Sequence, residues 1–378
     1  MHFVYCIKLI HQGNYHIYPK KKGNYHIYPQ KKVTTISLSS IFLPLPLPKL
    51  LSSSSRSHRL LPVRASSDAP AASASFDLRR YWTSLIADVE SELDAAMPMR
   101  PPESIHAAMR YAVLPGAGKE GAAKRAPPVL CVAACELLGA PRSAALPAAA
   151  ALEMLHAASL VHDDLPCFDA APTRRGRPST HAAFGTDMAV LAGDALFPLA
   201  YTHIIAHTPS PDPVPHAVLL RVMAELARAV GSTGMAAGQF LDLAGATALG
   251  EAEVMQVLTK KFGEMAECSA ACGAMLGGAG PDEEAALRRY GRTIGVLYEL
   301  VDDIRSASGN GKMRSNASVL RALGMDRALG IVEELKAQAK TEADRFADKY
   351  GDRVLPLCSF VDYAVERGFE LQDAAAAP

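Results

Sequence analysis

The chain has no acidic residue in its first 67 positions, although ten lysines and arginines occur there. The rest of the chain therefore carries 29 basic against 39 acidic residues, which argues against a nucleic-acid-binding surface. The sequence also lacks any run of 18 apolar residues, so no transmembrane helix is expected. Seven cysteines, an odd number in a chain of 378 residues, do not indicate a disulfide framework.

The stretch from Val33 to Ser67 is rich in serine, leucine and proline and carries several basic residues. This composition is typical of a transit peptide, although a plain disordered tail shares it. Three prolines between residues 44 and 48 would break the amphipathic helix of a mitochondrial presequence, so a plastid is the expected destination. Residues 1–65 are predicted to be a disordered targeting segment, and the repeat GNYHIYP within residues 13–29 is left without a role.

From Phe76 onward, alanine, leucine, methionine and glutamate dominate, and the alternating pattern of strands is absent. This composition predicts an all-α fold with helices of roughly 15 to 30 residues. Residues 66–378 are predicted to form one helical domain rather than two. The expected breaks between helices fall at residues 97–102, 115–128, 169–179, 208–215, 277–281 and 306–316.

Asp163 and Asp164 lie in the string VHDDLPCFD at the end of an alanine- and leucine-rich stretch, and Asp169 follows in an expected loop. Aspartate is almost never buried unless it is paired or bound to a metal. The three carboxylates are therefore candidate magnesium ligands. Arg174 and Arg175, just beyond them, are of the residue type that binds a diphosphate through paired hydrogen bonds. The sequence thus predicts a site for magnesium and a diphosphate at the end of this helix.

A second aspartate pair, Asp302 and Asp303, lies in the string LYELVDDIRSAS near the C-terminus. Two carboxylate clusters on facing helices can hold magnesium ions that clamp a diphosphate and weaken its C–O bond. An apolar tail on that diphosphate would need a deep pocket between helices, and a helical bundle can supply one. The two motifs together predict chemistry on a diphosphate ester with an apolar tail.

Longer strings around these motifs carry a family resemblance. The chain resembles the plastid trans-isoprenyl diphosphate synthases of the geranylgeranyl diphosphate synthase type, from about Phe76 to the C-terminus. The resemblance implies an isoprenoid-synthase-type helical bundle with a central apolar pocket, Mg²⁺ as cofactor and prenyl diphosphates as ligands. The matching strings are IHAAMRYAVLPG, PVLCVAACELLG, EMLHAASLVHDDLPCFD, RRGRPSTHAAFG, DMAVLAGDALF, GMAAGQFLDL and LYELVDDI.

The resemblance also implies individual roles. Asp163, Asp164 and Asp169 match the family's first metal motif, and Arg174 and Arg175 match the arginines that bind the two substrate diphosphates.

The family's string that grips isopentenyl diphosphate is altered in this chain. Lys124 and Arg125 match its first two basic residues, but Pro127 stands at its second arginine and extra residues precede it. His156 matches the histidine of that site, and Lys261 matches a lysine on the catalytic face.

The second metal motif departs further. It keeps Asp302 and Asp303, but Ser306 stands where active relatives carry a third aspartate, beside Arg305, and Lys312 is the substrate-binding lysine expected after it. Losing one charge about 4 Å from a cation costs of order 4 kcal/mol at an effective dielectric constant near 20. That cost equals about three powers of ten in rate. We therefore expect partial Mg²⁺ binding here and weak or no condensation activity from the chain alone.

Two cysteine pairs share an i, i+4 spacing: Cys131 with Cys135 in CVAAC, and Cys268 with Cys272 in CSAAC. Helix packing by small residues explains this spacing equally well, and a four-cysteine zinc site fits it poorly. In the resembled family, two such motifs mark small subunits that pair with a catalytic large subunit. The chain is similar to the type II small subunit, which implies a partner-interface role for these four cysteines.

The leading hypothesis is a plastid regulatory subunit that binds a geranylgeranyl diphosphate synthase large subunit and modulates prenyl diphosphate production for isoprenoid biosynthesis. One alternative is an active, magnesium-dependent trans-prenyltransferase that condenses isopentenyl diphosphate with allylic diphosphates. Another is a non-enzymatic scaffold that recruits the synthase. The three differ in how much chemistry the isolated chain performs.

Overall fold

The computed structural model describes residues 76–114, 123–210, 212–244, 250–306 and 318–366, and the backbone alone of residues 15–19, 25–29 and 307–308. The chain divides into two compact units, Met1–Ala74 and Ser75–Pro378. In the first unit, β1 (Tyr15–Pro19) and β2 (Tyr25–Pro29) pair antiparallel. The two copies of the repeat thus pair with each other. The rest of the predicted targeting segment lies outside the described residues.

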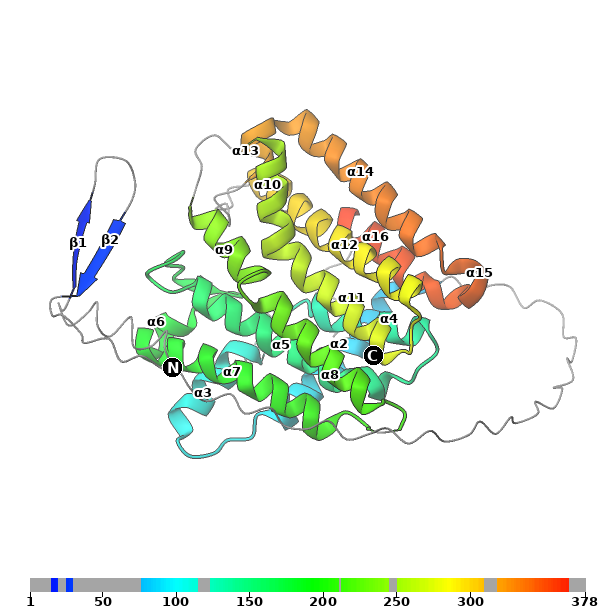
Figure 1. Cartoon of the computed structure of the whole chain (residues 1–378), viewed down its shortest axis with the longest axis horizontal. Helices are drawn as coiled ribbons and strands as arrows, with labels where there is room; N and C mark the ends of the chain where they lie inside the picture. The colour runs from blue at the N-terminus through cyan, green and yellow to red at the C-terminus, as the bar shows by residue number, and fades with distance from the viewer. Residues whose placement is uncertain are drawn as a thin grey trace, which may run out of the picture. The chain divides into compact units, whose positions relative to one another are not determined.

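The second unit is a helical bundle, as predicted (Figure 1). Its first half contains α2 (Leu78–Ala96), α3 (Glu103–Val113), α4 (Ala126–Leu137), α5 (Arg142–Asp163), the short strands β3 (Thr173–Arg174) and β4 (Arg177–Pro178), α6 (Thr180–Phe184), α7 (Thr186–His207) and α8 (His216–Val230). Its second half contains α9 (Met235–Leu243), α10 (Glu251–Leu258), the π-helix η1 (Thr259–Gly263), α11 (Glu264–Leu276), α12 (Pro281–Ser308), α13 (Val319–Leu323), α14 (Met325–Asp344), α15 (Ala347–Tyr350), the 3₁₀-helix η2 (Gly351–Val354) and α16 (Leu355–Glu366).

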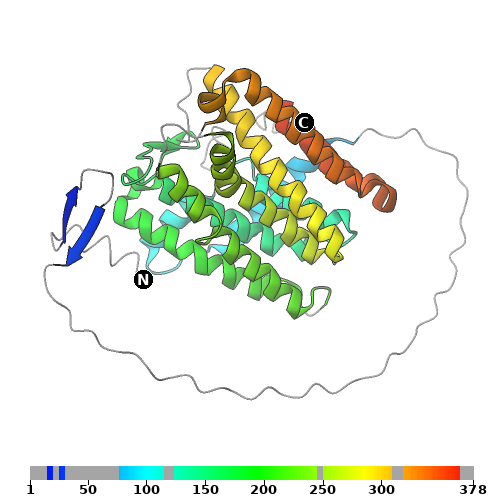
Figure 2. The same ribbon diagram turned by 45° about the horizontal axis from the view of Figure 1, so that its top comes forward.

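The packing centres on α5 and α11. Helix α5 contacts α4 and α7, while α11 contacts α4, α8 and α12. Helices α12 and α14 run side by side in both ribbon views (Figures 1 and 2). The alanines at 148–151 of α5 are completely buried, because small side chains let neighbouring helices approach closely on every side. Gly193 of α7 shows how close this approach is, since a Cβ there would lie 2.2 Å from Nε2 of His162.

Two helices, α5 and α7, are long and apolar enough to cross a membrane by length and composition. About 78% of the apolar window of α5 is buried inside the bundle, against 44% of that of α7. A buried core helix passes the same test, so this finding is weak evidence for a membrane span. Two large apolar side chains of α7, Leu191 and Ile205, are exposed.

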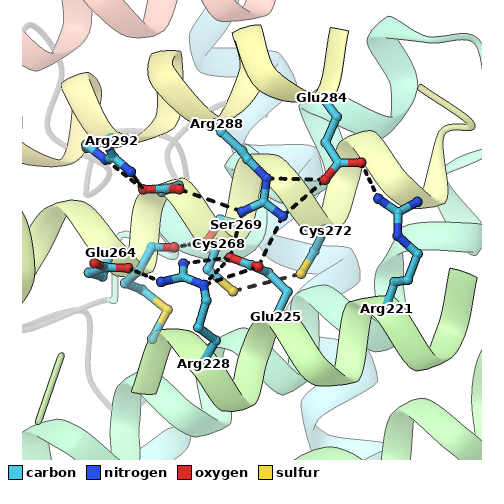
Figure 3. Close-up of polar contacts among 12 residues, drawn as sticks. Arg221, Glu225, Arg228, Glu264, Cys268, Ser269, Cys272, Glu284, Arg288 and Arg292 are labelled. Carbon is cyan, nitrogen blue, oxygen red and sulfur yellow. Dashed lines mark hydrogen bonds and ion pairs between the residues drawn. The ribbon is translucent and has the colours of Figure 1, made fainter. Parts of the chain in front are cut away.

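An ion-pair network joins α8, α11 and α12 beside the second cysteine pair (Figure 3). Arg288 of α12 lies 2.9 Å from Glu225 of α8, and Arg228 of α8 lies 2.7 Å from Glu264 of α11. Arg292 of α12 lies 2.6 Å from Glu267 of α11. The three glutamates are buried, and each meets at least one arginine, which removes the cost of burying a lone charge.

Candidate functional site

The predicted aspartate pair lies where α5 ends. Asp163 is the last helical residue and Asp164 is the C-cap, as the sequence predicted. The chain then turns back, because the backbone N–H of Asp169 donates to the carbonyl of Asp163 over 2.9 Å. This hydrogen bond brings the loop carboxylate of Asp169 next to the helix end. The three aspartates of the predicted metal motif therefore come from one helix terminus and one turn.

A short hairpin, β3–β4, carries the two predicted arginines. Arg174 pairs with Arg177 across the hairpin, and Arg175 and Gly176 form its two-residue turn. Both turn residues have positive φ, 53° for Arg175 and 74° for Gly176, as tight hairpin turns require. The hairpin directs the two arginine side chains to different acids: Arg174 to Asp164 and Arg175 to Glu153.

Arg174 and Asp164 form an ion pair in which the Nε of Arg174 lies 3.1 and 3.0 Å from the two carboxylate oxygens. Nη2 of Arg174 also contacts Oδ1. Asp164 is only 2% exposed, so the arginine neutralises a carboxylate that would otherwise be buried alone. A predicted metal ligand and a predicted diphosphate ligand thus bind each other.

Glu153 of α5 forms ion pairs with the other two predicted arginines, Arg125 and Arg175. Its Oε1 lies 2.5 Å from Nη1 of Arg125 and 3.1 Å from Nη2 of Arg175. Arg125 also donates to the carbonyl of Val113 over 2.9 Å, and its side chain is fully buried. Burial would raise the pKa of Glu153, but the two guanidinium groups hold it down at about 2. Arg125 therefore points into the bundle in this conformation rather than toward a substrate.

His156 lies one turn beyond Glu153 on the same helix. Burial, together with the nearby arginines, lowers its pKa to about 4 in spite of the neighbouring Glu153. The imidazole is therefore neutral at physiological pH. The structure thus brings His156, Arg125 and Arg175 together around Glu153; their binding of a substrate stays a prediction.

Asp163 and Asp169 face a shared environment that includes Lys261. Burial, together with the carboxylates of Asp169 and Asp164, raises the pKa of Asp163 to about 6, while Lys261 opposes the shift. Burial also raises the pKa of Asp169, with Asp242 of α9 and Asp164 adding to the effect. Carboxylates crowded in this way favour either a proton or a cation.

Lys261 lies on η1, a single π-helical turn between α10 and α11. Its Nζ lies 2.7 Å from Oδ2 of Asp242, and both side chains are buried. Gly238 allows this pairing, because a Cβ there would lie 2.5 Å from the backbone nitrogen of Lys261. The predicted catalytic-face lysine therefore lies in the first aspartate cluster, and α9 supplies the carboxylate that holds it.

The second aspartate pair is held differently. Ser318, the N-cap of α13, donates through its hydroxyl to Oδ2 of Asp303 over 2.6 Å. Arg305 is exposed and its Nη1 lies 3.5 Å from the carbonyl of Glu366. Asp302 and Ser306 are half-buried on α12. The carboxylate of Asp303 thus accepts a hydrogen bond from the residue that caps α13. The predicted substrate-binding Lys312 lies outside the described residues.

Lys124 reaches toward this second motif. Its Nζ lies 5.4 Å from the centre of the Tyr298 ring, one turn before Asp302 on α12. Lys124 is exposed, unlike its neighbour Arg125. The two basic residues predicted to act as a pair therefore point to different parts of the bundle.

A narrow pocket lies between α3, α5 and the hairpin. Leu160 and Val161 of α5 form part of its apolar side, and Asp164 with Arg174 and Arg175 forms its charged side. This pocket joins the predicted diphosphate residues to apolar residues of α5. The deeper apolar pocket at the centre of the bundle stays a prediction.

The predicted magnesium ligands fit the ion in part. Carboxylate oxygens suit Mg²⁺, which keeps several waters and needs only one or two protein carboxylates. Asp163 and Asp169, whose pKa values are raised, meet this need. Asp164 is held by Arg174 and Asp303 by Ser318. In the part of the chain that the structure describes, no three His, Cys, Asp or Glu side chains are arranged to hold a metal.

The four cysteines occupy the contact between α4 and α11, where all four are completely buried. Sγ of Cys268 lies 3.9 Å from Sγ of Cys272, and burial raises the pKa of Cys131, with Cys135 and Cys268 adding to it. A partner cannot touch these side chains while α4 and α11 pack in this way. The partner-interface role predicted for Cys131, Cys135, Cys268 and Cys272 stays a prediction, and with the thiols buried under the chain's own helices it would act through the packing of α4 and α11.

Sequence reasoning missed three residues of the site: Glu153, Asp242 and Ser318. Each holds a predicted residue through a hydrogen bond of 2.5 to 2.7 Å. Glu153 offered a signal, since a glutamate in an alanine-rich buried helix needs a cationic partner. The sequence around Asp242, in the string GQFLDL, and around Ser318, just before α13, contained no comparable signal.

Known proteins are similar to this chain over most of the helical bundle. A family model described as polyprenyl synthetase matches residues 103–317. The heterodimeric geranylgeranyl pyrophosphate synthase small subunit, chloroplastic, of Arabidopsis thaliana is 53% identical over 311 residues, which span 82% of this chain and 90% of that protein. The large subunit 1 of the heterodimeric enzyme, also chloroplastic and from Arabidopsis thaliana, is 37% identical over 308 residues, 78% of this chain and 80% of that protein. A solved FPP/GFPP synthase from Zymomonas mobilis, in its apo form, is 33% identical with a TM-score of 0.68, covering 76% of this chain and 99% of that one.

Proposed function

Because the chain belongs to the polyprenyl synthetase family, we propose that it is a regulatory small subunit that binds a plastid geranylgeranyl diphosphate synthase and modulates its prenyl diphosphate production. The observation that carries the proposal is the 53% identity to a heterodimeric small subunit, against 37% to a large subunit. Both relatives are named chloroplastic, which supports a plastid location. The second metal motif, in which Ser306 replaces a third aspartate beside Arg305, also supports a regulatory role.

Asp163 and Asp169 would hold magnesium, and Arg174, Arg175 and Lys124 would bind diphosphate oxygens. Magnesium, when bound, supplies positive charge that stabilises a leaving diphosphate. In this chain the two hairpin arginines are already neutralised by carboxylates. A diphosphate must therefore compete with the chain's own acids for them, and this competition supports weak activity in the absence of a partner.

The exposed face of α7 is the surface that we assign to the large subunit. Leu191 and Ile205 are 42% and 56% exposed on this helix, and Leu220 of the neighbouring α8 is 66% exposed. Apolar side chains exposed on two packed helices are candidates for a protein interface. A large subunit is the occupant that we favour, because both named relatives belong to a heterodimeric enzyme.

The test is a condensation assay with Mg²⁺, isopentenyl diphosphate and allylic primers, using the chain alone, a large subunit alone and both together. We expect weak or no turnover from the chain alone and a changed rate or product ratio from the mixture. Vigorous turnover by the chain alone would contradict the proposal and support the active prenyltransferase. In that case Ser306→Asp should change activity little.

The scaffold alternative predicts that Asp163→Ala leaves every effect on the large subunit intact. Under our proposal, this variant still binds the large subunit but no longer changes its product ratio in the same way. Measuring binding and product ratio on the same preparation separates the two.

A further inference from the structure

Trp82, the only tryptophan of the chain, lies on α2 and contacts the backbone at Lys124, a residue predicted to bind diphosphate. Its Nε1–H donates to the backbone carbonyl of Lys124 over 2.8 Å. Its ring packs against two aromatic residues of α16, with ring centroids 4.9 Å from Phe360 and 4.7 Å from Tyr363. Trp82 is 4% exposed, so this hydrogen bond is shielded from water. The N-terminal and C-terminal helices of the bundle thus meet at a carbonyl beside the predicted substrate site.

The segment that Trp82 contacts has an unusual backbone. Arg125, the residue after Lys124, has a left-handed conformation with φ 51° and precedes α4. The side chain of Arg125 is anchored inside the bundle by Glu153 and the Val113 carbonyl. Lys124 points the other way, with its ammonium over the Tyr298 ring. Neighbouring side chains often point in different directions, and here the left-handed backbone at Arg125 joins an exposed Lys124 to a buried Arg125.

A lysine ammonium at the end of four methylene groups is a poorly oriented ligand unless its backbone is fixed. The indole N–H supplies one fixed point at the Lys124 carbonyl, and the Arg125 ion pair supplies the other. We propose that Trp82 is a positioning residue of the diphosphate site, which holds Lys124 so that its ammonium stays over Tyr298 beside the second aspartate pair. This inference rests on the proposed function, in which the chain binds prenyl diphosphates.

The variant Trp82→Phe tests the hydrogen bond, because it keeps an aromatic ring on α2 and removes the N–H. Tyr81→Phe is the matched control. Tyr81 is the preceding residue of α2, and its hydroxyl donates to Glu136 over 2.6 Å, away from Lys124. Each change removes one side-chain hydrogen bond from the same helix.

The first measurement is amide hydrogen exchange in the ligand-free, full-length chain. Trp82→Phe should speed exchange in residues 123–129 by about three- to tenfold, which corresponds to one lost hydrogen bond. Tyr81→Phe should leave that segment unchanged. Equal exchange in wild type and Trp82→Phe would overturn the anchoring role of Trp82, whatever the chain binds.

The second measurement is calorimetric titration with inorganic diphosphate and Mg²⁺. Trp82→Phe should weaken binding about three- to tenfold, but less than twofold when Lys124→Ala is already present, because the two residues act through one contact. The single tryptophan also provides a signal: wild-type emission should shift on titration, and Lys124→Ala should abolish the shift. Equal losses in both backgrounds would mean that Trp82 acts by packing alone and would overturn the proposal.

The two measurements separate this inference from the proposed function. If the wild-type chain binds no diphosphate, alone or with a large subunit, ligand binding in the proposed function fails and so does the role of Trp82 at that ligand. Faster exchange in Trp82→Phe would still establish the Trp82–Lys124 anchor. If the wild type binds diphosphate and exchange is unchanged, only the anchor fails.

Discussion

Arg174 holds the carboxylate of Asp164 through its Nε, 3.1 Å from Oδ1 and 3.0 Å from Oδ2. Asp164 is buried at the C-terminus of α5, and Arg174 comes from a hairpin ten residues later. The pair therefore fixes the hairpin to the helix without any ligand. A diphosphate that binds Arg174 must therefore displace the Asp164 carboxylate from it.

Replacing Arg174 with glutamine should lower the free energy of unfolding by about 3 kcal/mol, because it leaves a buried carboxylate without its cation. Urea titration measures this change. Lys340→Gln is the control, since Lys340 and Asp362 form an exposed pair on α14 and α16. That change should cost less than about 1 kcal/mol. Equal costs would mean that the Arg174–Asp164 pair contributes no more than a surface ion pair.

His156 should make the stability of the chain depend on pH. Its pKa is lowered to about 4 in the folded chain, against 6.5 ordinarily. Between these values the unfolded chain binds a proton that the folded chain does not. The free energy of unfolding should therefore fall as pH falls from 6.5 toward 4, by at most about 3 kcal/mol from this group.

His156→Gln should remove that part of the pH dependence, and urea titrations between pH 4.5 and 7.5 measure it. His216→Gln, at the exposed start of α8, is the control. If the slope of His156→Gln matches that of wild type, the imidazole is not kept neutral by burial.

Magnesium should stabilise the wild-type chain and not Asp163→Asn. A cation relieves the burial and crowding that raise the pKa of Asp163 to about 6. At ten times its dissociation constant, a ligand adds about 1.4 kcal/mol to stability, or about 2 to 4 °C in Tm for a domain of this size. Thermal unfolding with MgCl₂, compared with KCl at equal ionic strength, measures this.

Asp303→Asn offers a comparison at the second motif, where Ser318 already holds the carboxylate. It should reduce the magnesium effect less than Asp163→Asn does. Identical Tm shifts in all three proteins would place the ion elsewhere.

The contact between α4 and α11 should be intolerant of added volume. A Cβ at Gly273 would lie 2.1 Å from the carbonyl of Cys131, so Gly273→Ala should destabilise the chain by about 1–3 kcal/mol. Gly330→Ala is the control, because a Cβ there meets only the end of Arg327, at 3.5 Å. That change should be neutral or stabilising, since alanine favours a helix more than glycine does.

The same variant tests how the cysteines affect a partner. If they act only by packing α4 against α11, Gly273→Ala and Cys131→Ser should weaken large-subunit binding in proportion to the stability that each loses. A large loss of binding by Cys131→Ser at unchanged stability would restore a direct role.

Ile205→Glu should weaken binding to a large subunit at least tenfold, because it places a charge on the exposed apolar face of α7. Leu329→Glu is the control. Leu329 lies on α14 and is 49% exposed, close to the 56% of Ile205. A binding titration with purified large subunit measures both variants. Equal effects would mean that the α7 face does not carry the interface.

The helical bundle could be predicted from the sequence because the residues between the helices differ clearly in type from the residues within them. Proline, glycine and loop residues separate the alanine-rich helices at 97–102 and 208–215, and the structure ends α2 and α7 at the first residues before these breaks. The hairpin and the π-helix were not predicted. Strands β3 and β4 have two residues each, which is too short for an alternation of polar and apolar residues to be recognised. The π-helix η1 continues the helical sequence pattern of α10 and α11, so nothing in that pattern distinguishes it.

Side-chain direction was the harder part of the site. Adjacent Lys124 and Arg125 read as one basic pair, but the left-handed backbone at Arg125 sends them apart. The i, i+4 spacing of the cysteines was compatible with helix packing, but spacing alone does not say which helix covers the thiols. The covering helix comes from chain regions more than 100 residues away, which local pattern does not encode.

The ion pairs among Glu225, Arg228 and Arg288 have a consequence for heating. Hydration of charged groups becomes less favourable as temperature rises, so withdrawing these groups from water costs less in a hot solution than in a cold one. The junction of α8, α11 and α12 should thus contribute relatively more to the stability of the chain in a hot solution than in a cold one.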